Sequence, residues 1–93
     1  MRPTFDIVAE MIALTCEVAR ERITLDSNLV NDLGIDSLDL LDITFAIDDA
    51  FGIAMPISQW LRTVHMGRIS SDQYFVMKGF CARIDALIAA ATA

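Results

Sequence analysis

The sequence is poor in the residues that build disulfide scaffolds, metal centres and catalytic triads. It has two cysteines, Cys16 and Cys81, and one histidine, His65, among 93 residues. Both cysteines stand in apolar segments with helical spacing, so we expect two free structural thiols, with one disulfide bridge or a reactive thiol as the alternative. Such a set is too small for a disulfide framework or a zinc centre.

Basic residues are also scarce. The chain has 7 lysines and arginines against 13 aspartates and glutamates, which gives a formal net charge of -6. A nucleic-acid backbone is bound by clustered lysine and arginine, so we expect no nucleic-acid partner. An acidic protein is instead attracted to basic surfaces of other proteins.

Long hydrophobic runs are missing as well. No apolar stretch approaches the roughly 20 residues that span a bilayer. The first residues, 1–6, lack the apolar core of a signal peptide. We therefore expect a cytoplasmic, monomeric protein that is not embedded in a membrane.

No segment alternates apolar and polar residues as a strand does, and the apolar residues instead recur at helical spacing. We predict an all-α fold in a single domain, 1–93. The predicted helices are one of about 15 residues capped by Thr4, one over 37–51 ended by Gly52, one over 56–66 ended by Gly67, and one over 71–89 capped by Ser70. The alanine-rich end, 89–93, is expected to fray.

Residues 21–36 lose the helical period but keep interleaved aliphatic residues. We predict a long ordered loop, pinned to the bundle by Leu25, Leu29 and Leu33. Long loops in small domains tend to be functional. This loop leads to Ser37, at the predicted start of the second helix.

Ser37 has two interpretations from the residues alone. It is either the N-cap of its helix or a point of covalent attachment, because a helix N-terminus stabilises a bound anion. A nucleophilic serine needs a base and a group that orients the base, and His65 alone does not supply them. We therefore predict no catalytic residue.

The second helix has a broad apolar arc and an acidic side. The apolar arc comprises Leu40, Leu41, Ile43, Thr44, Phe45, Ile47 and Phe51. Asp39, Asp42 and Asp49 share the opposite side, with Leu38 at its edge. This side is either a solvated face or a docking surface for a basic partner. Asp36, Asp39 and Asp42 could also hold a divalent cation loosely, although a solvated acidic face is the simpler expectation.

The run Asp-Leu-Gly-Ile-Asp-Ser-Leu-Asp over 32–39 resembles the attachment motif of acyl carrier proteins. The acidic helix that follows and its closing Phe-Gly, 51–52, resemble the same family over about residues 5–56. The resemblance implies a four-helix bundle with 4′-phosphopantetheine on Ser37, transferred from coenzyme A by a phosphopantetheinyl transferase (holo-acyl-carrier-protein synthase). It also implies that basic enzyme patches dock on Asp36, Leu38, Asp39, Asp42 and Asp49.

The C-terminal part has an extra amphipathic segment, 57–68, between the second and last long helices. This segment, with the runs 74–78 and 81–85, resembles specialised carriers of very-long-chain fatty-acid synthesis for lipid A in alphaproteobacteria. The resemblance implies a very long hydroxylated acyl chain, ketoacyl synthases as partners and delivery to a lipid A acyltransferase. The large side chains there either widen an acyl pocket or only fill the core: Trp60, Met66, Tyr74, Phe75 and Met77.

Four alternatives remain open at this point. The chain could be a general fatty-acid or polyketide carrier, or an aminoacyl or peptidyl carrier, although an acid-rich second helix is unusual for the latter. It could also be an unmodified helical adaptor that docks through its acidic helix. A small hydrolase using Ser37 lacks the base that it would need.

Overall fold

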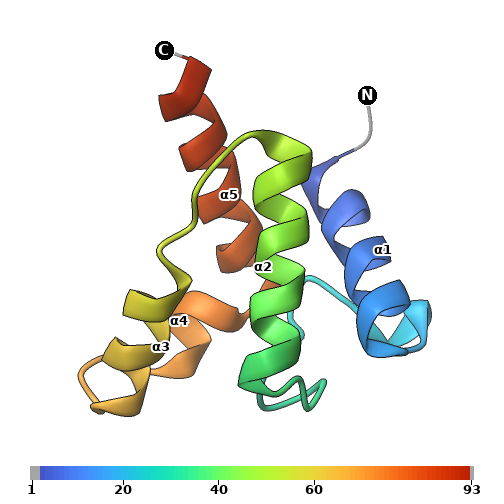
Figure 1. The fold of residues 1–93 in the computed structure, drawn as a ribbon. Coiled ribbons are helices and arrows are strands. Elements are labelled where there is room, and N and C mark those ends of the chain that lie inside the picture. The colour runs from blue at the N-terminus through green and yellow to red at the C-terminus, as the bar shows by residue number, and fades with distance from the viewer. Residues whose placement is uncertain (1–2, 93) are drawn as a thin grey trace.

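A computed structural model describes residues 3–92 as a helical protein (Figure 1). The elements are α1 (Thr4–Cys16), the 3-10 turn η1 (Arg20–Arg22), α2 (Ser37–Phe51), α3 (Ile57–His65), α4 (Ser71–Phe75) and α5 (Met77–Thr92). The described residues form no strand; one isolated β-bridge joins Asn28 and Val76. The all-α prediction is therefore confirmed.

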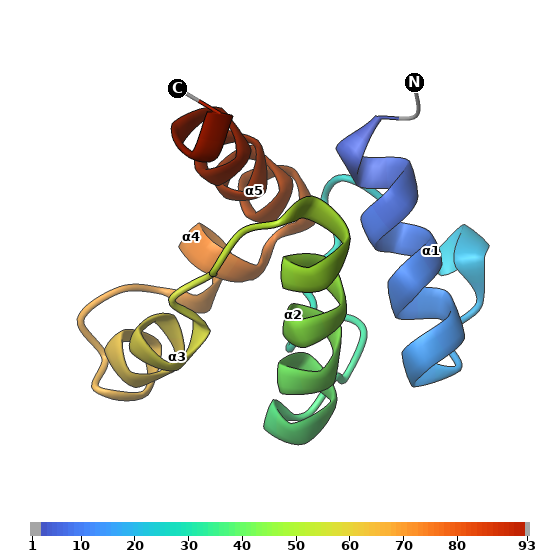
Figure 2. The ribbon, with the colours of Figure 1, turned by 45° about the horizontal axis from the view of Figure 1, so that its top comes forward.

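Helix α2 lies at the centre of the arrangement. Helix α1 packs against both α2 and α5, while α4 packs against α5. Two views show α3 on the opposite side of α2 from α1 (Figures 1 and 2). The fully buried side chains come from all of the long helices: Val8 and Ile12 of α1, Leu40, Ile43 and Ile47 of α2, and Met77, Phe80 and Ile84 of α5. The core is thus built jointly by α1, α2 and α5.

The long loop before α2 is ordered as predicted, but one of its expected anchors is wrong. Leu29 and Leu33 are buried, whereas Leu25 is 52% exposed. The backbone of Leu25 is what holds it, because its carbonyl accepts a hydrogen bond from the Lys78 N–H at 2.9 Å. A backbone hydrogen bond of this kind cannot be predicted from the spacing of apolar residues.

The predicted single helix over 71–89 is wrong, since the chain breaks at Val76. Val76 has extended dihedral angles (φ -73°, ψ 132°) between α4 and α5. The loop supplies backbone partners at the break: Leu29 N–H donates to the Phe75 carbonyl, and Met77 N–H donates to the Ser27 carbonyl, both at 2.8 Å. The break also changes the helical phase, so that Phe75 before it and Met77 after it are both fully buried.

The first and last helices end differently from the prediction. Helix α1 stops after 13 residues, and Glu17 follows it in the left-handed region (φ 55°). Thr4 is not a side-chain cap of this helix; its hydroxyl donates to an Asp85 carboxylate oxygen on α5. The alanine-rich end is helical through Thr92, and Ala93 lies outside the described residues.

Other predicted boundaries are confirmed. Gly52 (φ 67°) ends α2, Gly67 (φ 75°) lies in the turn after α3, and the Ser70 hydroxyl accepts from the Asp72 N–H at the start of α4. Phe45 is an exception to the predicted apolar arc of α2, because it is 65% exposed while its neighbour Thr44 is buried. The arc is wider than the surface that α1 and α5 cover.

Both cysteines are free thiols, as expected. Cys81 is buried on α5, and burial, followed by the charge of Asp85, raises the pKa of this thiol from 9.0 to about 12. Along the described part of the chain, none of the helices has the length and apolarity needed to traverse a bilayer.

Candidate functional site

Ser37 is the first residue of α2 and is exposed to solvent. The N-cap is Asp36, whose carboxylate accepts a hydrogen bond from the Asp39 N–H at 2.9 Å. The interpretation of Ser37 as the N-cap is therefore wrong. Within residues 3–92, no protein group hydrogen-bonds the Ser37 hydroxyl, which leaves this oxygen available for a covalent bond.

The loop positions this serine through backbone contacts. Gly34 turns the chain with a φ of 67°, which an L side chain rarely adopts. The next residue, Ile35, is buried, and its N–H donates to the Leu29 carbonyl at 3.1 Å. The hydroxyl thus stands two residues beyond a fixed point of the core.

Asn28 holds this loop together, and the sequence reasoning missed it. The side chain is 2% exposed, and its carbonyl oxygen accepts from the N–H groups of Val30 and Asn31 at 2.9 Å. Its amide nitrogen donates to Asp72 at 2.8 Å and to Ser71 at 3.2 Å, both on α4. The only sequence indication was the Ser-Asn pair at 27–28, which is typical of a turn but says nothing about α4.

The carboxylates of Asp36, Asp39 and Asp42 lie close enough together to act on one neighbouring thiol. The pKa of Cys16, on α1, is raised first by burial and then by the negative charges of Asp39, Asp36 and Asp42. These three residues therefore form an acidic surface around the start of α2. Asp49 is also exposed but lies near the other end of the helix.

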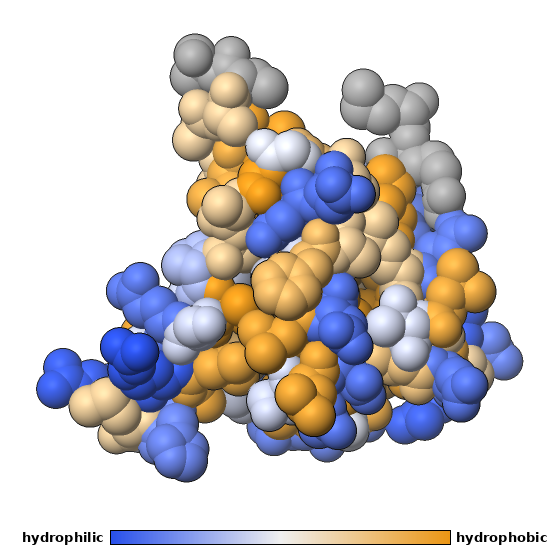
Figure 3. Space-filling view, viewed as in Figure 1, coloured by the Kyte–Doolittle hydropathy of each residue, from blue (hydrophilic) through white to orange (hydrophobic). Residues whose placement is uncertain are grey.

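Leu38 adds an apolar contact beside the acidic surface. Its side chain is 73% exposed, although it belongs to the first turn of a core helix. The space-filling view shows orange, hydrophobic surface exposed near the middle of this face, among blue side chains (Figure 3). An exposed leucine among carboxylates is a combination that protein partners bind.

Neither a triad nor a metal centre is assembled at the serine. His65, on α3, is exposed, and within residues 3–92 no hydrogen bond joins it to Ser37. Within residues 3–92, no three His, Cys, Asp or Glu side chains are arranged to hold a metal ion. The site can accept a group on oxygen, but it contributes no base of its own.

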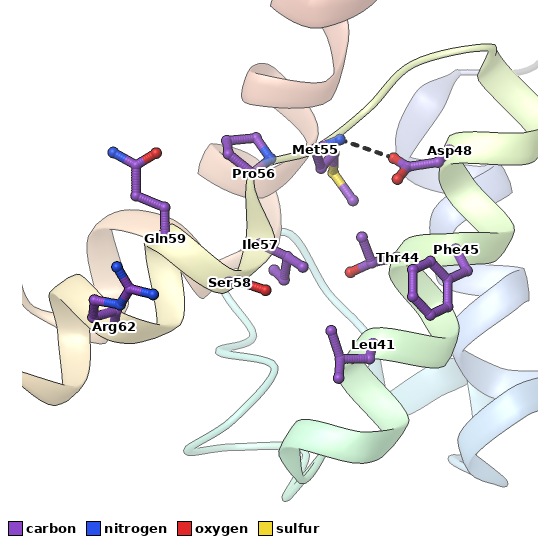
Figure 4. A pocket seen from close by; sticks show the side chains of 10 residues that line it. All are labelled: Leu41, Thr44, Phe45, Asp48, Met55, Pro56, Ile57, Ser58, Gln59 and Arg62. Carbon is purple, nitrogen blue, oxygen red and sulfur yellow. Dashed lines mark hydrogen bonds between the residues drawn. The ribbon is translucent and has the colours of Figure 1, made fainter.

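A groove of about 600 Å³ runs between α2 and α3 (Figure 4). One wall carries Leu41, Thr44 and Phe45 of α2, and the other carries Ile57 and Arg62 of α3. The remaining lining residues are Asp48, Met55, Pro56, Ser58 and Gln59. The volume lies in the range of small-molecule sites, and both helices contribute apolar and polar side chains to the lining.

Asp48 fixes the floor of this groove. Its carboxylate accepts a hydrogen bond from the Met55 N–H at 3.0 Å, and it thereby ties the segment before α3 back to α2 (Figure 4). Thr44 satisfies its own hydroxyl by donating to the Leu40 carbonyl at 2.8 Å. The Thr44 hydroxyl is therefore not left unpaired in the α2 wall of the groove.

The large side chains of the C-terminal part pack rather than line this groove. Phe75 and Met77 are fully buried, and Trp60 stacks on Tyr74 with ring centroids 5.2 Å apart. Arg83 lies over both rings, 5.8 Å and 4.7 Å from the centroids. Met66 is 58% exposed and belongs to neither group. These contacts favour the core-filling interpretation for Trp60, Tyr74, Phe75 and Met77.

The fold and the site together define a class of protein: a small helical carrier with a free serine hydroxyl at a helix start. A family model described as "Phosphopantetheine attachment site" matches residues 6–64. The chain belongs to the acyl carrier proteins, which makes it a carrier of an attached group rather than an enzyme.

Relatives match over nearly the whole length. The chain is 54% identical over 90 residues to acyl carrier protein AcpXL of Brucella melitensis, with 97% of each chain covered. It is 56% identical over 93 residues to AcpXL of Mesorhizobium japonicum, with both chains fully covered. The acyl carrier protein of Treponema denticola is 36% identical over 56 residues, which are 60% of this chain and 72% of that one.

Proposed function

We propose that the chain carries a very long, hydroxylated fatty acyl group as a thioester on 4′-phosphopantetheine attached to Ser37, for the synthesis of lipid A. The attachment is supported by one observation at the start of α2: the residue that caps the helix is not the serine. Asp36 caps the helix, so the Ser37 hydroxyl is exposed and unbonded among the described residues. The N-terminal end of the helix dipole favours the phosphodiester that results.

The surroundings of Ser37 fit this group. Phosphopantetheine supplies a thiol that holds the acyl chain as a thioester. For its attachment, the Ser37 oxygen forms a bond to phosphorus as the phosphoanhydride bond of coenzyme A breaks, and the nucleotide leaves. Among residues 3–92 no base is hydrogen-bonded to Ser37, so the hydroxyl proton goes to a base of the phosphopantetheinyl transferase.

We further propose that partner enzymes bind the acidic surface of α2. Asp36, Asp39 and Asp42 act with Leu38, and Asp49 extends the contact along the helix. Basic patches on phosphopantetheinyl transferase and on ketoacyl synthases complement these charges, which speeds encounter. The groove between α2 and α3 then shelters the acyl chain between visits.

The very-long-chain assignment has two supports. The extra segment and final helix resemble the carriers of that pathway, and the AcpXL relatives match at 53–56% identity over nearly the entire chain. Three relatives named only "acyl carrier protein" are 32–36% identical, and their matches cover 59–70% of this chain. A lipid A acyltransferase then takes the acyl chain from the carrier. We also propose that the protein works as a monomer in the cytoplasm.

Intact mass measurement tests the attachment. The chain is incubated with coenzyme A and a phosphopantetheinyl transferase, and wild type is expected to gain the mass of one phosphopantetheinyl group. Ser37→Ala should gain nothing, while Ser58→Ala, which removes a serine of the groove, serves as a matched control and should be modified like wild type. A wild-type chain that stays unmodified would favour the unmodified adaptor.

A further inference from the structure

The segment from the end of α2 to the start of α4 has a charge opposite to that of the rest. Residues 50–71 contain no aspartate or glutamate, although the whole chain has 13. With Arg62 and Arg68, this segment has a formal charge of +2, whereas the remaining residues sum to -8. The molecule is therefore not uniformly acidic.

The two arginines of this segment differ from the other described basic residues in having no protein partner. Arg20 pairs with Asp6 at 3.5 Å, and Lys78 pairs with Asp26 at 3.4 Å. The remaining two are also engaged: Arg22 donates to the carbonyl of Asp32, and Arg83 lies over two aromatic rings.

By contrast, Arg62 and Arg68 are exposed, and within residues 3–92 no side-chain hydrogen bond, ion pair or ring contact engages either guanidinium. Fold stability does not account for them, because they stabilise no neighbour. His65 and Met66, also exposed, lie between them in the sequence. We call Arg62, His65, Met66 and Arg68 the cationic lobe.

The cationic lobe adjoins the groove between α2 and α3 through Arg62. Arg62 lines the α3 side of the groove, while Leu41 and Phe45 line the α2 side (Figure 4). The space-filling view shows strongly hydrophilic side chains over the α3 end of this face (Figure 3). An enzyme that covers the groove mouth to reach the acyl arm therefore contacts both sides.

From this arrangement we infer that the cationic lobe docks on an acidic surface of the enzymes dedicated to this carrier, beside the basic patch that binds Asp36, Asp39 and Asp42. The inference rests on the proposed function, because it assigns a second contact to the same partners. Two patches of opposite charge on the carrier fix the orientation in which a partner enzyme can dock on it. They also disfavour enzymes whose docking surface is basic throughout, since like charges then face the lobe.

An anionic lipid surface is a weaker explanation of the same charges. A basic side chain near such a surface contributes about 1 kcal/mol, so two arginines contribute little. The rest of the chain, with a formal charge of -8, is repelled by the same surface. A protein partner can place an acidic patch against the lobe alone, which a uniformly anionic membrane cannot.

The test uses the full-length carrier loaded with a fatty acyl thioester, a malonyl thioester as the two-carbon donor, and the dedicated ketoacyl synthase of very-long-chain elongation, with release of carbon dioxide. The double variant Arg62→Gln, Arg68→Gln is expected to lower kcat/KM by about fivefold through a higher KM, and by less at high salt. The matched control is Arg22→Gln, Lys78→Gln, which removes the same charge elsewhere and should stay within about twofold of wild type. Thermal unfolding of both variants establishes that they are folded.

Three results would overturn the inference. These are an unchanged KM in the lobe variant, an equal loss in the control variant, and binding to phosphatidylglycerol vesicles that only the lobe variant loses. If the synthase does not elongate the acyl chain on the wild-type carrier, the proposed function fails as well. A general phosphopantetheinyl transferase with a basic docking patch should modify the lobe variant at least as fast as wild type.

Discussion

At the scale of single residues, Asp36 has two separable roles at the attachment site. Its carboxylate caps α2 through the Asp39 N–H, and its charge belongs to the acidic surface that we propose as a docking site. Asparagine can accept the same capping bond without the charge, whereas alanine can do neither. Substitution at this one position can therefore distinguish fold from recognition.

We expect Asp36→Ala to lose about 1 kcal/mol of unfolding free energy, and Asp36→Asn to lose much less. Both variants should be pantetheinylated more slowly than wild type at low salt, and the difference should shrink at high salt. Urea unfolding and initial rates of modification give the two readouts. Equal rates for Asp36→Asn and wild type at low salt would mean that the charge is not read by the transferase.

The buried thiol of Cys81 makes a prediction about alkaline pH. Its pKa is raised from 9.0 to about 12 by burial and Asp85, so the folded state keeps the proton where the unfolded state releases it. Stability is thus unaffected below pH 9 and falls as the pH rises between these two values, by at most about 1.4 kcal/mol per pH unit.

Thermal unfolding measured from about pH 8 to about pH 11 should show this loss, and Cys81→Ala should show a shallower dependence. The comparison of slopes matters here, because the variant also loses a little packing at every pH. If the stability of wild type and of Cys81→Ala fell equally steeply with rising pH, a group other than Cys81 would cause the loss of stability at alkaline pH.

At the scale of elements, the joint between α4 and α5 depends on the loop that precedes α2. Asn28 supplies hydrogen bonds to two loop N–H groups and to Ser71 and Asp72 of α4. The backbone around Val76 pairs with the same loop. The loop that positions Ser37 and the break in the last helix therefore stabilise each other.

We expect Asn28→Ala to cost about 3 kcal/mol, because it leaves buried polar groups without partners. The control is Asn31→Ala, an exposed position whose side chain makes one hydrogen bond, to Ser71, and whose loss should cost about 1 kcal/mol or less. Urea unfolding measures both. Similar losses for the two variants would argue that Asn28 does not organise the joint.

At the scale of the whole molecule, the groove between α2 and α3 predicts that the bound acyl chain changes the unfolding free energy. If the acyl chain occupies the groove of about 600 Å³, its burial stabilises the folded state by up to about 0.8 kcal/mol per buried methylene. A long chain should then stabilise more than a short one. Because 1 kcal/mol corresponds to about 4–8 °C in a domain of this size, the difference is measurable.

We therefore expect the melting temperature to rise from the holo form to a short acyl form, and to rise further with a long acyl form. The three forms differ only in the group on Ser37, so the holo form is the internal control. Identical melting temperatures for the short and long forms would place the acyl chain outside the protein.

Local sequence is enough to predict the helical class and the end of α2 at Gly52, and it is also the basis of the proposed attachment at Ser37. These follow from local properties: the helical period of apolar residues, the backbone freedom of glycine, and a specific run of eight residues. Tertiary structure decided the break at Val76, the exposure of Phe45 and the roles of Asn28 and Asp48, because each depends on hydrogen bonds or surfaces supplied by distant segments. It also showed that Asp36 caps α2, which leaves the Ser37 hydroxyl without a hydrogen bond among residues 3–92, as the proposed attachment requires.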